Sequence, residues 1–317
     1  MLGDIITPDL FASALRIATP LALAAIGGTI CERSGVVNIA LEGIMLTGAF
    51  FGTAAVLATN SPWLGVLVAM LAGAAIAAIH AFASINLRTD QVVSGTAINL
   101  LALGVTGFLM EVWYGHPGST ATIAVLKPIF SFDTPGGGFF AEVWRWINGV
   151  LLSHTPIVYL AILIAIVAQW AMYRTRWGLR LRALGEHPRA VETVGVNVYR
   201  GRWVAVLMSG ALGGLAGANL TIEQVGSFTE NMTNGRGFIA LAANIFGRWT
   251  PVGSYLASLL FGFADALQIK MQILRGVINI PPQLFYMVPY ILTVVVLAGV
   301  IGRAVGPAAV GQPYEKE

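Results

Sequence analysis

The sequence predicts an all-α, polytopic membrane protein with about eight to ten transmembrane helices. Of its 317 residues, 56% are hydrophobic and only 10% are charged, whereas soluble domains carry about a quarter charged residues. The mean hydropathy is +0.77, and hydrophobic runs recur along the whole chain. Most of these runs approach the roughly 20 apolar residues that a helix needs to cross a bilayer. Residues 1–317 are therefore expected to form a single transmembrane domain.

Nine hydrophobic runs follow one another in the chain. They occupy residues 10–30, 36–58, 62–85, 91–113, 150–173, 203–225, 237–249, 251–269 and 284–301. Seven are long enough to span, whereas 284–301 is marginal and 237–249 is short. Because Thr250-Pro251 breaks helical structure after the short run, 237–269 predicts a broken or re-entrant pair that lines a pathway. The alternative is a plain tight hairpin between two helices.

The distribution of basic residues predicts the orientation in the membrane. The connection 174–202 is the only dense arginine cluster, and the positive-inside rule favours a cytoplasmic position for it. Nine alternating crossings place twelve basic residues on that side: Arg174, Arg176, Arg180, Arg182, Arg189, Arg200, Arg202, Arg33, Arg88, Arg248, Arg303 and Lys316. Five lie opposite: Lys127, Arg145, Arg236, Lys270 and Arg275. The N-terminus is therefore expected outside and the C-terminus in the cytoplasm.

Two connections between the runs are long. The outer connection, 114–149, leads into Phe139 to Leu152, where Trp144 and Trp146 predict a helix lying at the membrane surface. The inner connection, 174–202, is the most polar stretch of the chain. A cluster of like charge usually anchors neighbouring helices, and this explains the arginines at both ends of the loop but not its middle.

The middle of the inner loop predicts a short amphipathic helix. Pro188 occupies a position that a first helical turn tolerates, Glu186 precedes it, and Gly195 suits a helix stop. Helical spacing separates an apolar face from charged residues, with Ala190, Val191 and Val194 on one side and Arg189 and Glu192 on the other. An apolar face without a core to cover is expected to seat in a groove on a partner protein.

The sequence argues against several classes of enzyme. No lysine follows a glycine, so the phosphate-binding G-x-x-x-x-G-K-[ST] loop is absent, and no G-x-S-x-G motif occurs. A single cysteine and four scattered histidines offer no metal-binding spacing. We therefore predict no catalytic, cofactor-binding or metal-binding residues.

Three stretches carry a resemblance to a known family. Leu184-Gly185-Glu186-His187-Pro188-Arg189-Ala190, running on to Asn197, resembles the coupling-helix segment of ABC-importer permeases of the branched-chain amino acid, simple-sugar and nucleoside type. The stretch 32–43 (ERSGVVNIALEG) is similar to the N-terminal signature of the nucleoside and simple-sugar branch, and 237–253 matches a third family segment. The resemblance covers roughly residues 30 to 300. One departure is His187, which stands where asparagine is common.

The resemblance implies a multi-pass permease subunit of the bacterial inner (plasma) membrane that is not itself an enzyme. Its implied partners are a cytoplasmic ABC ATPase, a sister permease or second copy, an external solute-binding protein and membrane lipid, with no nucleic acid and no cofactor. The implied contacts with the ATPase are Gly185, Glu186, Pro188, Arg189, Ala190, Val191, Val194 and Gly195. In this scheme Ala190, Val191 and Val194 fill a socket, and Glu186 and Arg189 fix the register.

Polar residues and aromatic rings inside the runs are candidates for the substrate pathway. A nucleoside presents hydroxyls and base edges, which favour amides and hydroxyls beside aromatic faces. The candidates are Asn38, Glu42, Phe50, Thr96, Asn99, Asn244 and Phe246. Glu42 is an ionisable group inside a span, which suggests either function or a structural hydrogen bond. Asn219, Glu223 and Gln224 are further polar residues, with Glu223 placed near an outer end where water solvates it.

The sequence leaves both the substrate and the class of protein open. The substrate could be a nucleoside, a simple sugar or a branched-chain amino acid, in that order. The chain could also be a secondary transporter or channel that acts without an ATPase, although few buried charge pairs are present. An intramembrane enzyme is the least favoured class. The motifs Gly48-x-x-x-Gly52, Gly210-x-x-x-Gly214 and Gly213-x-x-x-Gly217 predict close helix packing, within the chain or between subunits.

Overall fold

The computed structural model describes residues 6–115, 118–130, 139–273 and 305–315, together with positions 287, 291 and 294. These residues form helices and connecting segments without a strand, apart from one isolated bridge between Ser119 and Thr229. Within these described ranges, seven helices are long and apolar enough to cross a membrane. They are α2 (Pro8–Glu32), α3 (Leu41–Thr59), α4 (Pro62–Ala81) with η1 (Phe82–Asn86), α5 (Gln91–Tyr114), α7 (Pro156–Arg174), α10 (Val198–Ala218) with η3 (Asn219–Val225) and α12 (Pro251–Ile273).

Five shorter helical segments complete the described fold. They are α6 (Phe139–Ile147), η2 (Asn148–Leu152), α8 (Arg176–Glu186), α9 (Pro188–Thr193) and α11 (Arg236–Phe246). The helix predicted over Phe139 to Leu152 is present as α6 and η2. Each of the seven runs predicted to be long enough to span overlaps one of the seven long helices. Helix α3 begins at Leu41, five residues after the start of its run, and α7 begins six residues after the start of its run. The predicted span 284–301 falls outside the described residues.

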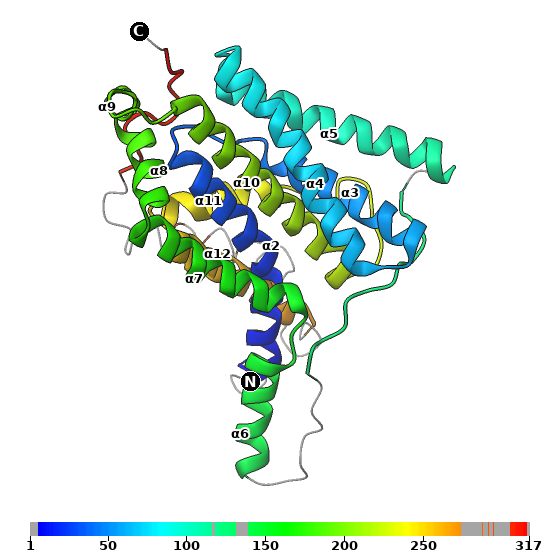
Figure 1. Cartoon of the computed structure of the whole chain (residues 1–317). Coiled ribbons are helices and arrows are strands. Elements are labelled where there is room, and N and C mark those ends of the chain that lie inside the picture. The colour runs from blue at the N-terminus through cyan, green and yellow to red at the C-terminus, as the bar shows by residue number, and fades with distance from the viewer. Residues whose placement is uncertain are drawn as a thin grey trace.

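Helices α2 and α10 form the centre of the bundle. Most residues of both helices are buried, whereas α5, α7 and much of α12 present apolar side chains outward. Helix α10 packs against α2, α3 and α4, and α2 packs along α12 (Figure 1). An exposed apolar exterior around a buried centre is the arrangement expected for a bundle in a lipid bilayer.

The contact between α3 and α10 depends on small residues. A Cβ built on Gly48 would lie 2.6 Å from the Cα of Gly214, closer than side-chain carbons approach one another. Gly217 packs in the same way against the backbone of Met45 and Ala49. The predicted glycine-mediated packing is therefore confirmed, and at these positions it joins helices of one chain rather than two subunits.

The predicted broken segment is present as α11 and α12, separated by the short turn Gly247–Thr250. Helix α11 ends at Phe246, three residues before the predicted end, and α12 begins at Pro251. Arg248 and Trp249 in the turn have φ angles of 55° and 51°, a left-handed conformation that non-glycine residues adopt rarely. Helix α11 packs on α2 and α3 as well as on α12. Helix α11 also packs beside α12 beyond the turn, where Phe246 stacks on Phe261, so the pair has the contacts of a hairpin between two helices as well as the predicted break.

The arginine-rich loop and the tail, defined as residues 305–315, lie together at one end of the bundle (Figure 1). The Ala309 amide donates to the Gly185 carbonyl at 2.8 Å, and the Gly311 amide donates to the Gly35 carbonyl at 3.2 Å. The buried guanidinium of Arg202 donates to the carbonyl of Gln312 at 3.1 Å. The first described turn of α2 lies at the opposite end (Figure 1).

Candidate functional site

The coupling segment, defined as α8, α9 and residues 194–195, forms the surface at the arginine-rich end. Pro188 begins α9 as predicted, and Gly195, with a φ of 80°, follows its end as predicted. Ala190 is exposed, and Val194 is 75% exposed. These two side chains give the segment an unpartnered apolar surface within the described residues.

Val191 differs from the prediction. Its side chain is only 7% exposed, and it packs with Leu184, Val198 and Tyr314. The expectation that Val191 shares an outward face with Val194 is therefore wrong. Helix α9 ends at Thr193, so Val194 leaves the helical phase, and the tail supplies a core for Val191 that local sequence spacing does not reveal.

The tail is fixed to the coupling segment by specific contacts. The Tyr314 hydroxyl donates a hydrogen bond to the Glu192 carboxylate. Burial, together with that carboxylate, raises the pKa of Tyr314 to about 12. A groove of about 710 Å³ lies between the tail and the coupling segment. Its lining includes Glu186, Pro188, Arg189 and Ala190, so four of the predicted coupling residues lie around one surface feature.

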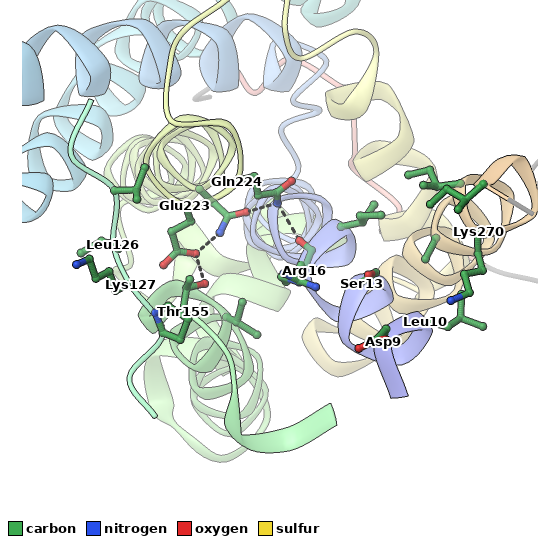
Figure 2. A pocket seen from close by; sticks show the side chains of 18 residues that line it. Asp9, Leu10, Ser13, Arg16, Leu126, Lys127, Thr155, Glu223, Gln224 and Lys270 are labelled. Atoms are coloured by element: carbon green, nitrogen blue, oxygen red, sulfur yellow. Dashed lines mark hydrogen bonds between the residues drawn. The ribbon is translucent and has the colours of Figure 1, made fainter. Parts of the chain in front are cut away.

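A second cavity lies at the opposite end of α2 and α10, and we call it the outer pocket (Figure 2). Its volume is about 570 Å³, within the usual range for small-molecule sites. The walls come from the first turns of α2, from η3, from the last turns of α12 and from the segment 125–128. Charged side chains of both signs line it: Asp9, Arg16, Lys127, Glu223 and Lys270.

A hydrogen-bonded network organises one wall of the outer pocket. The Glu223 carboxylate accepts from the Thr155 hydroxyl at 2.7 Å, the Ile157 amide at 2.8 Å and the Asn219 side-chain amide. The side-chain amide of Gln224 donates to the Asn219 side chain at 2.8 Å and to the Arg16 carbonyl at 2.9 Å (Figure 2). These bonds fix the carboxylate and the two amides in place before any ligand arrives.

Comparison with known proteins identifies the family. A family model described as "Branched-chain amino acid transport system / permease component" matches residues 10–297. The chain belongs to this family of permeases. It is a multi-pass protein of the inner membrane and a transport component of an ABC importer.

Three curated relatives match the permease over nearly its whole length. The guanosine ABC transporter permease protein NupQ of Bacillus subtilis is 44% identical, with 94% of each chain covered. The nucleoside ABC transporter permease protein NupC of Lactococcus lactis is 39% identical, with 96% of each chain covered. A Haloferax volcanii protein, TsgC13, provisionally named a glucose ABC transporter permease protein, is 35% identical over 96% of each chain.

The structure gives Glu42 a definite structural partner in the permease. Its carboxylate accepts hydrogen bonds from the backbone amides of Gly235 at 2.7 Å and Gly237 at 2.6 Å. These amides lie at the N-terminal end of α11, where backbone donors lack helical partners and a negative charge is stabilising. Of the two readings of Glu42, the structural hydrogen bond to a neighbouring helix is present. Glu42 therefore holds the start of the broken segment against α3.

Removing this cap is expected to loosen the first turn of α11. In a Glu42→Ala variant, the buried Gly237 amide and the partly buried Gly235 amide lose their acceptor, at a cost of about 1–2 kcal/mol. Hydrogen exchange of a peptide covering 234–240 should therefore quicken roughly fivefold or more. Glu42→Gln keeps one acceptor oxygen and should give an intermediate rate. Unchanged exchange in Glu42→Ala would contradict the capping role.

The other predicted pathway residues of the permease are dispersed over the fold. The Asn244 side chain accepts from the Thr29 hydroxyl at 2.7 Å and joins α11 to α2, and Asn38, in the connection between α2 and α3, donates to the Ser209 hydroxyl of α10 at 2.8 Å. Asn99 bonds the backbone of Gly43 and Ile39. The rest lie elsewhere, with Thr96 exposed on α5, Phe50 in an aromatic cluster with Phe51, Trp113 and Phe228, and Phe246 stacked on Phe261. None of the seven candidates lines the outer pocket.

The polar residues of the outer pocket are not among the seven predicted candidates for the substrate pathway. Glu223 and Asn219 belong to the π-helical turn η3 that ends α10, and a charge near a helix end is usually solvated by water. The carboxylate is instead partly buried and bonded to three protein groups. The closely spaced polar residues Asn219, Glu223 and Gln224 were the available signal. That spacing places amides and a carboxylate together at one helix end.

Proposed function

We propose that this permease translocates nucleosides into the cell as the transmembrane part of an ATP-driven importer. The observation that carries the proposal is the similarity to the guanosine permease NupQ and the nucleoside permease NupC over at least 94% of each chain. A simple sugar is the second candidate, because the relative TsgC13 is provisionally named for glucose transport. Nucleosides and sugars share vicinal hydroxyls, so one polar site suits either class.

The proposed topology has nine crossings, with the N-terminus outside and the C-terminus in the cytoplasm. The arginine cluster supports a cytoplasmic position for the coupling segment. Ala190 and Val194 would then contact an ABC ATPase, with Glu186 and Arg189 at the rim of the contact. An external solute-binding protein would dock at the opposite face, and a sister permease or second copy would complete the dimer.

We assign the first substrate contacts to the outer pocket. The Glu223 carboxylate can accept from ribose hydroxyls, and the amides of Asn219 and Gln224 can pair with base edges. No hydrogen bond or ion pair of the Arg16 guanidinium occurs in the described structure, and Arg16 lines the pocket. Its planar group can stack on a base or donate to an acceptor of the ligand. Asn38 and Asn244 would lie farther along the pathway, in the buried centre.

The test is uptake by the complete importer in proteoliposomes, with radiolabelled guanosine, glucose and leucine compared. Guanosine uptake that requires ATP is expected. In an Arg16→Gln variant the KM for uptake should rise roughly tenfold or more, because a charged hydrogen bond to the ligand is lost. The matched control is Arg145→Gln on α6, which leaves the outer pocket unchanged. Uptake of leucine alone, or guanosine uptake without the ATPase, would refute the proposal.

A further inference from the structure

Arg33 connects two parts of the fold that are far apart in sequence. It follows the last residue of α2, and its side chain is only 16% exposed. The guanidinium donates from Nε to the Trp249 carbonyl at 2.8 Å and from Nη2 to the Arg248 carbonyl at 3.2 Å. Its third nitrogen, Nη1, lies 3.9 Å from a carboxylate oxygen of Glu186 in the coupling segment. One side chain therefore contacts both the turn between α11 and α12 and the segment that faces the cytoplasm.

The turn that Arg33 holds is conformationally strained. Arg248 and Trp249 both have positive φ angles, and such residues persist only where their surroundings impose the conformation. Here the imposed contacts come from the end of α2. Besides the two bonds from Arg33, the Trp249 indole donates to the Glu32 carboxylate. Losing the Arg33 bonds would leave two carbonyls of the turn without this donor and would favour another backbone arrangement.

The coupling segment also contacts Arg33 through its backbone. Gly185, in the last turn of α8, packs so closely on the Arg33 carbonyl that a side chain could not fit between them. A movement of α8 and α9 would therefore push directly on this residue. At the other end of the connection, α11 is held to α3 by Glu42. A displacement that enters at Arg33 would thus tilt α11 about a fixed first turn.

We propose that Arg33 is a positioning residue that transmits movement of the coupling segment to the turn between α11 and α12. The inference rests on the proposed function, because it supposes an ATPase that moves the coupling segment. In this scheme, closure of the ATPase shifts Gly185 and Glu186, Arg33 follows, and the strained turn changes the position of α11. The two discrete arrangements that a packed connection allows would then correspond to two states of the pathway.

The test measures ATP hydrolysed per nucleoside imported by the reconstituted importer. For Arg33→Met, which removes all three interactions of the guanidinium, this ratio should rise roughly two- to thirtyfold. Arg33→Lys keeps the charge and one donor direction, so its ratio should lie between wild type and Arg33→Met. The matched control is Arg88→Met, because Arg88 pairs with Glu315 on the same face but does not touch the turn. That variant should keep the wild-type ratio.

The ratio separates transmission from a merely structural role. If Arg33 only stabilises the fold, hydrolysis and import fall together and the ratio stays constant, which would overturn the inference. If Arg33→Met does not assemble, Arg33→Lys decides in the same way. Wild-type importer that takes up no nucleoside would refute the proposed function instead. Wild-type uptake with an unchanged ratio in both Arg33 variants would refute only the role of Arg33.

Discussion

Replacing Ala190 and Val194 together by aspartate is expected to abolish nucleoside uptake while the permease remains folded and inserted. Both positions are exposed, so carboxylates there are solvated in the isolated subunit. In the complex, the proposed ATPase socket would desolvate two unpaired charges, at a cost of several kcal/mol. Uptake should fall roughly 100-fold or more, measured in proteoliposomes at equal permease content.

The contrasting variant is Val191→Asp. Val191 is buried among Leu184, Val198 and Tyr314, so a carboxylate there disrupts the packing of the coupling segment on the tail. This variant should lower the melting temperature of the isolated permease, which the Ala190→Asp/Val194→Asp pair should leave nearly unchanged. Normal uptake by the double variant would show that these side chains do not contact the ATPase.

Gly214→Val is expected to prevent stable folding. A side chain at this position would collide with the backbone of α4 near Ala69 and Met70, and Gly48 approaches from α3. Backbone cannot move aside as a flexible side chain can, so the cost should exceed the about 1–3 kcal/mol typical of overpacked cores. Size-exclusion chromatography in detergent should show little monodisperse protein. The matched control, Gly107→Val on α5, has no atom within 4 Å of the added carbon and should elute normally.

The elements that could be predicted from sequence are those that the bilayer determines. Membrane thickness imposes a minimum length on each apolar helix, so the seven long runs were recognisable from hydrophobicity alone. The break before Pro251 was recognisable because proline cannot continue a helix. The starts of α3 and α7 were less predictable, because the apolar run begins before the helix does. Val36 and Val37, for example, belong to the connection that precedes α3.

The parts of the site that escaped prediction depend on contacts between distant residues. Local spacing predicts that Val191 faces outward, but Tyr314, more than a hundred positions later in the chain, covers its side chain. The sequence leaves Glu42 open between a functional role and a structural hydrogen bond, and only the distant Gly235 and Gly237 amides reveal the hydrogen bond. Spacing along one helix reveals which side chains share a face, but it does not reveal what packs on that face.

The position of the tail has a consequence for the order in which this protein matures. Residues 305–315 complete the groove beside α9 and bury Val191 through Tyr314. The ribosome makes these residues after every described helix, so the surface formed by α9 and the tail is finished only once all of those helices have been synthesised. A nascent or truncated permease would present α9 without its support. Under the proposed function, an ATPase that recognises this surface would bind only chains in which every described helix has been synthesised.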